Sequence, residues 1–489
     1  MKLLLIQPAQ TGTADRDLTE KRGWTLVRPL SLFYLASAVR QRTKHQVEIL
    51  DLELSRHHQS SDALSTTLRR LAPDVVGVTA TTMTRFEAAR LISDVREALP
   101  ECGLIAGGVH FGPTDLDAMH HLPALDAIVR GEGEIPLVEY LGRRDRRESL
   151  DGVPSLTWRR GAEVVRNPDG MAVENLDELA PYDDFDLQDY PEYVMGCGEQ
   201  RIPALSVMAS RGCPYRCVFC AKAGMGYRTR DPGCVVREIV ELKRRFGISG
   251  VNFLDLTFTA SPKQVEALCG EILRSRVEVQ WWCEVRANMD LRLLELMRAA
   301  GCVAIAVGVE SGSPRILREI SKGITLDQVH ALADRARQLG LKTTVYLMYS
   351  HPNETWDDVQ QTIRLAGEVE QKGHATAIQP TMILPGTGIE ELARGSGQLG
   401  ADFSWFAPFR SAMSEELVGM PHMQLFMDRL TPEQMRAVPA LAAAERDQAS
   451  IRAETARGLW RRAWGGVARH WTRPGYIAER ARAFVRARL

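Results

Sequence analysis

Three cysteines near the middle of the chain, Cys213, Cys217 and Cys220, stand at C-x3-C-x2-C spacing, and the aromatic Phe219 directly precedes the last of them. Cysteine thiolates hold iron–sulfur clusters, and a [4Fe–4S] cube normally takes four of them. Three cysteines therefore predict a cluster that leaves one iron open to another ligand. Zinc is the alternative, but it usually takes four protein ligands in pairs such as C-x2-C. No second pair lies nearby.

The elements that must position these cysteines form a regular pattern between residues 201 and 398. Apolar runs alternate with amphipathic stretches, which is typical of parallel strands joined by crossover helices. We predict strands at residues 205–209, 251–254, 279–283, 303–309, 343–348 and 377–383, and helices at 234–246, 262–274, 291–300, 325–339 and 356–371. The cysteines directly follow the first strand. Polar residues follow the later strands, at the end where barrels carry out their chemistry.

Residues 1–145 show a second alternation of the same kind. The predicted strands are 3–6, 47–50, 75–79, 104–106 and 127–129, and helical patterns include 32–41, 86–99 and 135–141. This pattern predicts a doubly wound parallel sheet, which binds ligands beyond the carboxyl ends of its strands. The segments expected at that edge are Gln7-Pro8, 79–85, 107–110 and 131–134.

The rest of the chain has a different character. Residues 146–200 contain a predicted hairpin around Arg160-Gly161 and an acidic, proline-bearing connector at 174–191. Residues 399–489 form a mainly helical region, whose end carries tryptophans and arginines at helical spacing, among them Trp460, Trp464 and Trp471. A basic helix with tryptophans can lie on an anionic membrane surface, although such tryptophans more often pack against their own domain.

The composition excludes several classes of protein. The net charge is -1, so no overall field favours a nucleic-acid partner. Nine cysteines in 489 residues are too few for a disulfide scaffold. Free thiolates and an oxygen-labile cluster indicate a reducing cytoplasm. The sequence contains no run of about 18 apolar residues, so it predicts no membrane-spanning helix.

The cysteine motif resembles the signature of the radical S-adenosylmethionine superfamily, in which that cofactor occupies the open iron and is cleaved to a 5′-deoxyadenosyl radical. Residues 1–400 together resemble its cobalamin-binding branch, through Pro29-Leu30, 106–110, 129–134 and the segments after the cysteines. This resemblance implies an α/β protein with a flavodoxin-like sheet followed by a partial (β/α)6 barrel. A methylthiotransferase is excluded, because it carries three further amino-terminal cysteines and only Cys102 precedes residue 197.

The resemblance also implies the site residues. Cys213, Cys217 and Cys220 would hold the [4Fe–4S] cluster, and S-adenosylmethionine would contact Phe219, Asp255, Arg286, Glu310, Ser311 and Gly312. Ordinary strand-end capping is the alternative for any one of these. The turn at 350–355 resembles a family turn, and we treat Glu354 as structural.

Cobalamin would lie against the first domain at Thr79, Thr82, Arg85, Gly107, Gly108, Gly131, Glu132 and Gly133. The Asp-x-His-x-x-Gly motif that supplies a cobalt ligand elsewhere is absent, so His110 is expected to be structural. Arg85 is the candidate for the lower face of the corrin, or else an ordinary residue at a helix start. A first domain that has lost its cofactor is the alternative.

The expected activity is methylation of an unactivated carbon of a small molecule or natural product by the radical and methylcobalamin. An oxidative cyclase or rearrangement enzyme with the same cofactors is the second candidate, and a non-catalytic sensor is the third. The expected partners are a substrate that can be hydrophobic and an electron donor such as flavodoxin or ferredoxin, with membrane contact through the carboxy-terminal helix as a further option and no nucleic acid.

Overall fold

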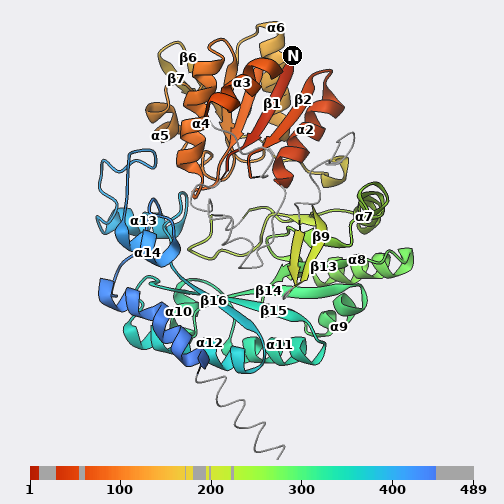
Figure 1. Cartoon of the computed structure of the whole chain (residues 1–489), viewed down its shortest axis with the longest axis vertical. Coiled ribbons are helices and arrows are strands. Elements are labelled where there is room, and N and C mark those ends of the chain that lie inside the picture. The colour runs from red at the N-terminus through yellow and green to blue at the C-terminus, as the bar shows by residue number, and fades with distance from the viewer. Residues whose placement is uncertain are drawn as a thin grey trace, which may run out of the picture.

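The computed structural model describes residues 1–9, 29–53, 61–170, 172–179, 194–197, 200–221 and 225–447. Two seven-stranded sheets organise these residues, the first drawn in red and orange and the second in colours from yellow through green to light blue (Figure 1). The tryptophan- and arginine-bearing segment at 457–488 lies outside the described residues. Within them, no helix combines the length and apolar character that crossing a membrane requires.

The first sheet has the strand order β2-β1-β3-β4-β5-β6-β7, and its first five strands are parallel. The order 2-1-3-4-5 is flavodoxin-like, as predicted. Its strands are β1 Lys2–Gln7, β2 Gln46–Asp51, β3 Val75–Thr79, β4 Gly103–Gly107, β5 Ala127–Val129, β6 Leu156–Arg160 and β7 Glu163–Arg166. Its helices are α2 Leu30–Arg42, α3 Ser61–Leu71, α4 Arg85–Ala98, α5 Asp115–His121 and α6 Glu134–Arg146.

Both faces of the middle of this sheet are buried, which explains why strands β1, β3, β4 and β5 are almost continuously apolar. Leu4 and Ile6 of β1 belong to a core that includes side chains of α3, α4 and α5. Leu3 and Leu5 point the other way, into a core with α2 and α6. The doubly wound prediction is confirmed by this split.

The second sheet is a partial barrel of six parallel strands with one antiparallel strand added at its edge, in the order β16-β15-β14-β13-β12-β9-β8. Its strands are β8 Val194–Cys197, β9 Gln200–Val207, β12 Gly250–Phe253, β13 Gln280–Val285, β14 Cys302–Glu310, β15 Lys342–Tyr349 and β16 Ala375–Pro380. Its helices are α7 Pro232–Phe246, α8 Pro262–Ser275, α9 Arg292–Ala299, α10 Pro314–Glu319, α11 Leu326–Gln338 and α12 Trp356–Gln371. The partial barrel confirms the predicted fold class.

Local signals start several barrel helices. Helices α7, α8 and α10 each begin at a proline, directly after Asp231, Ser261 and Ser313, whose side chains accept hydrogen bonds from the first turn. Proline suits the first helical position because its missing N–H would be unpaired there anyway. These caps end the loops after β9, β12 and β14 at defined residues.

The segments outside the two alternating regions join the sheets instead of standing apart. The predicted hairpin forms as β6 and β7, and it extends the first sheet through antiparallel pairing of β5 with β6. After β16 the chain forms α13 Gly388–Gly395 and α14 Ala412–Val418, at the side of the molecule where the sheets approach (Figure 1). Trp405, Phe406 and Phe426 from this region enter the apolar core of the first domain.

Candidate active site between the two sheets

The cysteine loop lies between the two strands of a short antiparallel pair, β10 Ser210–Arg211 and β11 Arg228–Thr229. Its first cysteine, Cys213, is two residues after the end of β10. Gly212 has φ +86°, and a Cβ atom there would collide with the carbonyl of Gly226. The amide of Cys213 donates to the carbonyl of Met225 at 3.1 Å. The base of the loop is therefore fixed by its backbone, and only glycine fits at its first turn.

The three cysteines lie across the ends of neighbouring barrel strands. Cys213 Sγ is 3.7 Å from Thr257 Oγ1, after β12, and Cys217 Sγ accepts from Arg286 Nη1 at 3.7 Å, after β13. The amide of Cys220 donates to the carbonyl of Cys217 at 3.1 Å, so both belong to one turn. The thiols are thus presented together at the carboxyl ends of the strands, where barrel enzymes hold their chemistry.

This arrangement fits a cluster better than a single ion. Among the residues that the structure describes, no three cysteine, histidine or carboxylate side chains converge closely enough to hold one metal ion. Zinc needs such convergence, whereas a [4Fe–4S] cube binds each cysteine through a different iron. The loop geometry therefore favours the cluster over zinc.

Arg286 holds the cysteine loop from the barrel side. Its side chain is 6% exposed, and its guanidinium lies 3.7 Å from the centre of the Tyr215 ring. It also donates to the carbonyl of Lys322 and to Cys217 Sγ. The predicted cofactor residue is thus at the cluster loop, as a cation beside one of its sulfurs.

Asp255 supports the same loop from below. Its carboxylate accepts from the amide of Ala209 at 3.1 Å and from the hydroxyl of Ser210. Burial raises the pKa of Asp255 to about 6 even though these hydrogen bonds act to lower it. The contacts of Asp255 within the protein make it a residue that positions β10.

Glu310 lies at a break in the register of β14, with φ +76°. Its carboxylate pairs with Lys322 Nζ at 2.7 Å, and both side chains are buried. Lys322 Nζ is also 5.7 Å from the centre of the Phe219 ring. The end of β14 and the last turn of the cysteine motif therefore share one buried ion pair.

Ser311 and Gly312, predicted cofactor contacts, are held against α12. The amide of Gly312 donates to Thr362 Oγ1 at 2.9 Å, and Ser311 Oγ is 3.3 Å from the same oxygen. A Cβ atom on Gly312 would collide with the carbonyl of Gln361. Both residues therefore pack closely on α12, and their contact with S-adenosylmethionine stays a prediction.

The turn after β15 contains two buried titratable groups. His351 Nδ1 is 3.2 Å from Thr381 Oγ1, while His351 Nε2 and Glu354 Oε1 find no hydrogen-bond partner among the described residues. Glu354 Oε2 accepts from the amide of His351 at 3.0 Å, and burial raises the pKa of Glu354 to about 8. Burial lowers the pKa of His351 to about 4. Both groups are therefore neutral near pH 7.

Glu354→Gln is expected to remove a pH dependence of stability. A carboxyl whose pKa rises from 4.5 to about 8 on folding stabilises the protein fully below pH 4.5, and this is lost as the pH rises to about 8. Denaturant midpoints measured across this window should converge for wild type and variant at low pH. At high pH the variant should gain up to about 1.4 kcal/mol per pH unit over wild type.

The quantity to compare is the difference in stability between wild type and variant at each pH. His110 and His351 have lowered pKa values, so they make both proteins less stable as the pH falls below 6.5, and this effect cancels in the difference. Glu391→Gln, at an exposed position, is the control and should follow wild type at every pH. Parallel pH profiles for wild type and Glu354→Gln would contradict a neutral buried carboxyl.

The carboxyl edge of the first sheet offers a surface for a flat ligand. Gly108 has φ +94°, and a Cβ atom there would lie 2.6 Å from Thr79 Oγ1. Next to it, Val109 is 40% exposed, and Met83 in the neighbouring loop is 39% exposed. Two exposed apolar side chains beside a glycine backbone suit a corrin ring, which is the ligand predicted for Thr79, Gly107 and Gly108.

Beneath that surface lies His110, which is fully buried. His110 Nδ1 is 3.2 Å from Thr82 Oγ1, and the ring lies 5.3 Å from that of Phe406 and 5.8 Å from that of Trp405. Burial lowers the pKa of His110 to about 3, with a further contribution from Arg85. Thr82 and His110 thus support the edge from inside the domain.

Arg85 is also buried, at 1% exposure. Its guanidinium donates to the carbonyls of Thr82 at 2.7 Å and Trp405 at 3.0 Å, and to that of His422. The cation is therefore engaged by the carboxy-terminal region, and the expectation that Arg85 lies beneath the corrin stays a prediction. Arg85 fastens residues 405–422 to the first domain.

Arg85→Met is expected to destabilise the protein by about 3 kcal/mol or more. Three buried hydrogen bonds from a charged donor are lost, and each is worth about 1.5–3 kcal/mol. Chemical denaturation measures the loss, and limited proteolysis should newly cut near residues 403–423. Arg90→Met, on an exposed position of the same helix, should leave both unchanged. Wild-type stability in the Arg85 variant would show that the segment is held by other contacts.

The Gly131–Glu134 loop follows β5 at the same edge. Gly131 has φ +69°, and no atom lies within 4 Å of the place where its Cβ atom would stand, so this residue leaves open space. A Cβ atom on Gly133 would lie 2.8 Å from Leu35 Cδ2, so close packing on α2 explains this glycine. Glu132 pairs with Arg211 Nη1 at 3.2 Å and with Arg228. Glu132 therefore reaches the cysteine loop and is engaged there.

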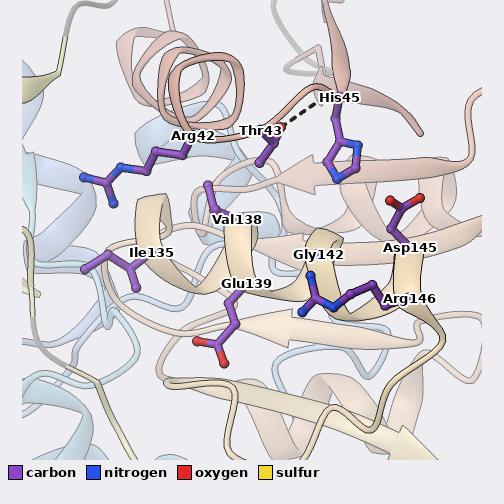
Figure 2. Close-up of a pocket in the computed structure, with 9 residues that line it drawn as sticks. All are labelled: Arg42, Thr43, His45, Ile135, Val138, Glu139, Gly142, Asp145 and Arg146. Atoms are coloured by element: carbon purple, nitrogen blue, oxygen red, sulfur yellow. Dashed lines mark hydrogen bonds between the residues drawn. The ribbon is translucent and has the colours of Figure 1, made fainter.

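A surface pocket of about 440 Å³ lies elsewhere on the first domain (Figure 2). His45 directly precedes β2, and Arg42 and Arg146 end α2 and α6, so the pocket is at the amino-terminal edge of the sheet. The predicted cofactor residues lie at the opposite edge. The pocket is lined by Arg42, Thr43, His45, Ile135, Val138, Glu139, Gly142, Asp145 and Arg146.

The remaining described cysteines are buried or hydrogen-bonded. Cys102, Cys269, Cys283 and Cys302 are buried, and burial raises the pKa of Cys269 to about 12. Cys234 Sγ accepts from Arg237 Nη2 at 3.0 Å. The four buried thiols are packing residues, and Cys234 is partly accessible but lies outside the cysteine loop, at the start of α7.

Sequence reasoning missed Arg211, Arg228 and Lys322, three cations around the cysteine loop. Arg211 and Arg228 occupy the two paired strands that close the loop, and charged residues at that place were the available signal. Lys322 follows α10 with no pattern that points to Glu310. Thr257, which contacts Cys213, stood in a predicted strand-end segment but was not singled out.

Two family models match the chain. A model described as the B12 binding domain matches residues 25–141, and one described as the radical SAM superfamily matches residues 207–366. The first covers strands β2 to β5 of the flavodoxin-like sheet, and the second begins at the end of β9 and includes the cysteine loop. Both cofactor assignments therefore coincide with the two edges described above.

Two curated relatives are similar to this chain over most of its length. An uncharacterized methyltransferase of Pyrococcus horikoshii is 31% identical over 76% of this chain and 78% of its own. The anaerobic magnesium-protoporphyrin IX monomethyl ester cyclase of Rubrivivax gelatinosus is 26% identical over 65% of this chain, which spans 58% of the cyclase.

Among solved structures, the fold matches that of the radical S-adenosylmethionine methyltransferase TsrM from Kitasatospora setae, determined with cobalamin and a [4Fe–4S] cluster bound. The TM-score is 0.68 at 19% identity, over 91% of this chain and 88% of TsrM. At this identity the match concerns the fold, and it includes both domains. With both family models and the Pyrococcus relative, the chain belongs to the cobalamin-binding radical S-adenosylmethionine enzymes.

Proposed function

We propose that this protein methylates an unactivated carbon of a small organic molecule. The observation that carries the proposal is the direct contact between the two cofactor edges, through Glu132 of the first domain and Arg211 beside the cysteine loop. When bound, the cluster with S-adenosylmethionine supplies a 5′-deoxyadenosyl radical, and cobalamin supplies the methyl group. The protein must hold these groups close together and exclude water.

The chain's own residues divide these tasks. Cys213, Cys217 and Cys220 are the proposed cluster ligands, and Arg286 and Phe219 line the cluster side. Thr79, Gly107, Gly108 and Gly131 form the proposed corrin edge. Buried Asp255 and Glu310 tie the ends of β12 and β14 to the loop, so the thiols keep one geometry. Such preorganisation lowers the cost of bringing reacting groups together.

The inside of the barrel is the proposed substrate site. Trp281, Cys283 and Val285 of β13 point into the core behind the sheet, so Glu284 points to the inner side. Tyr346 on β15 is 44% exposed, and Leu256 after β12 is 40% exposed. Partial removal from water and the negative charge of nearby Glu310 raise the pKa of Glu284. The Glu284 side chain is nevertheless exposed. These side chains favour a substrate with an apolar part and a polar group near Glu284.

Other parts of the proposal concern the setting of the reaction. We propose an external one-electron donor such as flavodoxin or ferredoxin, because the cluster must be reduced before it can act. We propose a cytoplasmic location, because the loop thiols need reducing conditions. Membrane contact through residues 457–488 and the division into 1–145, 146–200, 201–398 and 399–489 stay predictions.

The test needs no knowledge of the substrate. Anaerobically reconstituted, corrin-loaded protein is reduced and given S-adenosylmethionine with a trideuterated methyl group. A methyltransferase should form S-adenosylhomocysteine and place the labelled methyl group on the bound corrin, as mass spectrometry detects. Protein prepared without cobalamin is the control and should form 5′-deoxyadenosine alone.

The Rubrivivax relative keeps oxidative cyclisation as the second candidate. Formation of 5′-deoxyadenosine without any S-adenosylhomocysteine, in protein fully loaded with cobalamin, would replace methylation by cyclisation or rearrangement. Failure to cleave S-adenosylmethionine at all would leave the non-catalytic sensor.

A further inference from the structure

Four charged side chains connect the first domain to the root of the cysteine loop. Arg211 donates to Glu134 Oε1 at 2.8 Å and lies 3.2 Å from Glu132 Oε2, while Arg228 pairs with the other carboxylate oxygen of Glu132. All four side chains are largely buried, with exposures of 4% for Glu134, 13% for Glu132, 15% for Arg211 and 21% for Arg228. We call this set the interdomain clamp.

The clamp is satisfied and electrostatically matched. Burial acts to raise the pKa of Glu132, but the hydrogen bond from Arg228 and the charge of Arg211 outweigh it and bring the pKa below its ordinary value. The amide of Val173 also donates to Glu132 Oε2 at 3.1 Å. The Arg211 guanidinium lies 5.3 Å from the centre of the Tyr34 ring on α2. Each clamp residue therefore has one defined place.

On the barrel side, the clamp is rigidly connected to the first cysteine. Arg211 is followed by Gly212, whose backbone has no room beside Gly226, and then by Cys213, whose amide is bonded to Met225. Arg228 lies opposite Arg211 in the β10–β11 pair. A shift of Arg211 is therefore expected to move Cys213 by a similar amount.

On the other side, the clamp is continuous with the corrin edge. Glu132 directly follows Gly131. A Cβ atom added at Gly112 would lie 3.6 Å from the amide nitrogen of Gly131 and 3.4 Å from the carbonyl oxygen of Gly108, so Gly112 packs between these two loops. Glu134 starts α6, where a carboxylate is favoured by the helix dipole. The loops after β4 and β5 thus lie against each other, directly beside the two carboxylates.

We propose that Glu132, Glu134, Arg211 and Arg228 are positioning residues that set the separation and orientation of the cluster relative to the corrin. The role rests on the proposed function, since this separation governs transfer of the methyl group to the substrate radical. Radical formation needs only the cysteine loop and S-adenosylmethionine. A loosened clamp therefore uncouples the two half-reactions instead of stopping both.

The test compares Glu132→Gln with Glu139→Gln, whose parent residue pairs with Arg143 on α6 away from the barrel. The first readout is pulsed electron paramagnetic resonance of the reduced cluster and cob(II)alamin, which reports their distance distribution without turnover. Glu132→Gln should broaden or shift it, and Glu139→Gln should not. The second readout is hydrogen exchange of the 208–221 and 225–230 amides, which should speed up in Glu132→Gln alone.

The third readout is the yield of methylated product or methylated corrin per 5′-deoxyadenosine. Glu132→Gln should lower this ratio about tenfold, because a misplacement of about 1 Å can cost up to ~10²-fold in rate. Arg211→Lys, which keeps the charge but cannot fork between two carboxylates, should fall between wild type and Arg211→Gln.

An unchanged distance distribution together with an unchanged product ratio would overturn the proposal. Equal loss of both half-reactions at an unchanged ratio would also overturn it, because it indicates a merely structural role. Should Glu132→Gln fail to bind cobalamin, Arg228→Lys provides the same three readouts with both charges retained. If wild type itself methylates nothing, the distance and exchange readouts still decide the clamp, independently of the proposed function.

Discussion

Replacing Cys213, Cys217 and Cys220 together by alanine is expected to abolish the iron–sulfur absorption and all 5′-deoxyadenosine formation while leaving the corrin bands in place. The three thiols belong to a loop over the ends of β12 and β13, and the proposed corrin edge belongs to a separate sheet with its own core. A cube cannot be held without cysteine ligands. The measurement is the ultraviolet–visible spectrum of anaerobic, iron-reconstituted protein, with iron, sulfide and cobalamin contents and product assays.

Cys234→Ala is the matched control for this experiment. Cys234 lies at the start of α7, close in sequence to the loop, and its thiol is partly accessible. Its removal should change neither cofactor. Loss of the cluster in Cys234→Ala would show a fourth ligand, and retention of a cluster in the triple variant would show that other thiols bind it. Cluster absorption without corrin in wild type would contradict the cobalamin assignment.

The strands could be predicted closely because burial on both faces gives a simple signal. Strands β3 and β5 have the predicted bounds, and β1, β2 and β4 differ by one residue at each end. In β16 the structure ends at Pro380, whereas the pattern predicted 377–383. Met382 and Ile383 are apolar too, but they turn to meet the carboxy-terminal region, through a bridge from Met382 to Leu425 and burial of Ile383 in the first-domain core. Hydrophobicity alone does not distinguish these two kinds of burial.

The cysteine ligands were also predictable, because their spacing is local. Their supporting residues were predictable only as strand-end polar groups, without individual roles. Asp255 and Arg286 do lie at the loop, whereas Ser311 and Gly312 are engaged by α12. One strand end can face the site or the covering helix, and a single residue of register decides which. The break in register between Gly308 and Glu310 is not visible in the sequence.

Contacts between domains were the part that the sequence could not provide. Arg85 and Trp405 are 320 positions apart, and Glu134 and Arg211 are 77 apart. Charged residues are mostly exposed, so nothing in the sequence indicated that these charges would be buried against another part of the protein. Their burial depends on how two domains meet, which no local pattern contains. The Gly-Glu-Gly-Glu segment was therefore predicted at the carboxyl edge of the sheet, but the ion pairs of Glu132 and Glu134 with Arg211 were not predictable.

Gly108→Ala is expected to lower cobalamin loading by about five- to 100-fold while the cluster is retained. Alanine at φ +94° is strained, and its Cβ atom would lie 2.6 Å from Thr79 Oγ1, on the edge proposed for the corrin. Strained backbone of this kind costs about 1–3 kcal/mol, which corresponds to that loss of affinity when ligand binding requires the strained loop. Cobalamin titration followed by absorbance measures the affinity, and iron content checks the barrel.

Gly161→Ala separates the effect of the corrin edge from that of backbone strain alone. Gly161 has φ +62° in the turn between β6 and β7, with no atom within 4 Å of its Cβ position, so alanine meets strain there without a clash and away from the edge. It should lose some stability but bind cobalamin as wild type does. Full cobalamin affinity in Gly108→Ala would move the corrin away from the Thr79–Gly108 contact, and equal loss of both cofactors would indicate general unfolding. Selective loss of the corrin here, together with selective loss of the cluster in the cysteine variant, requires two independent sites, one on each sheet.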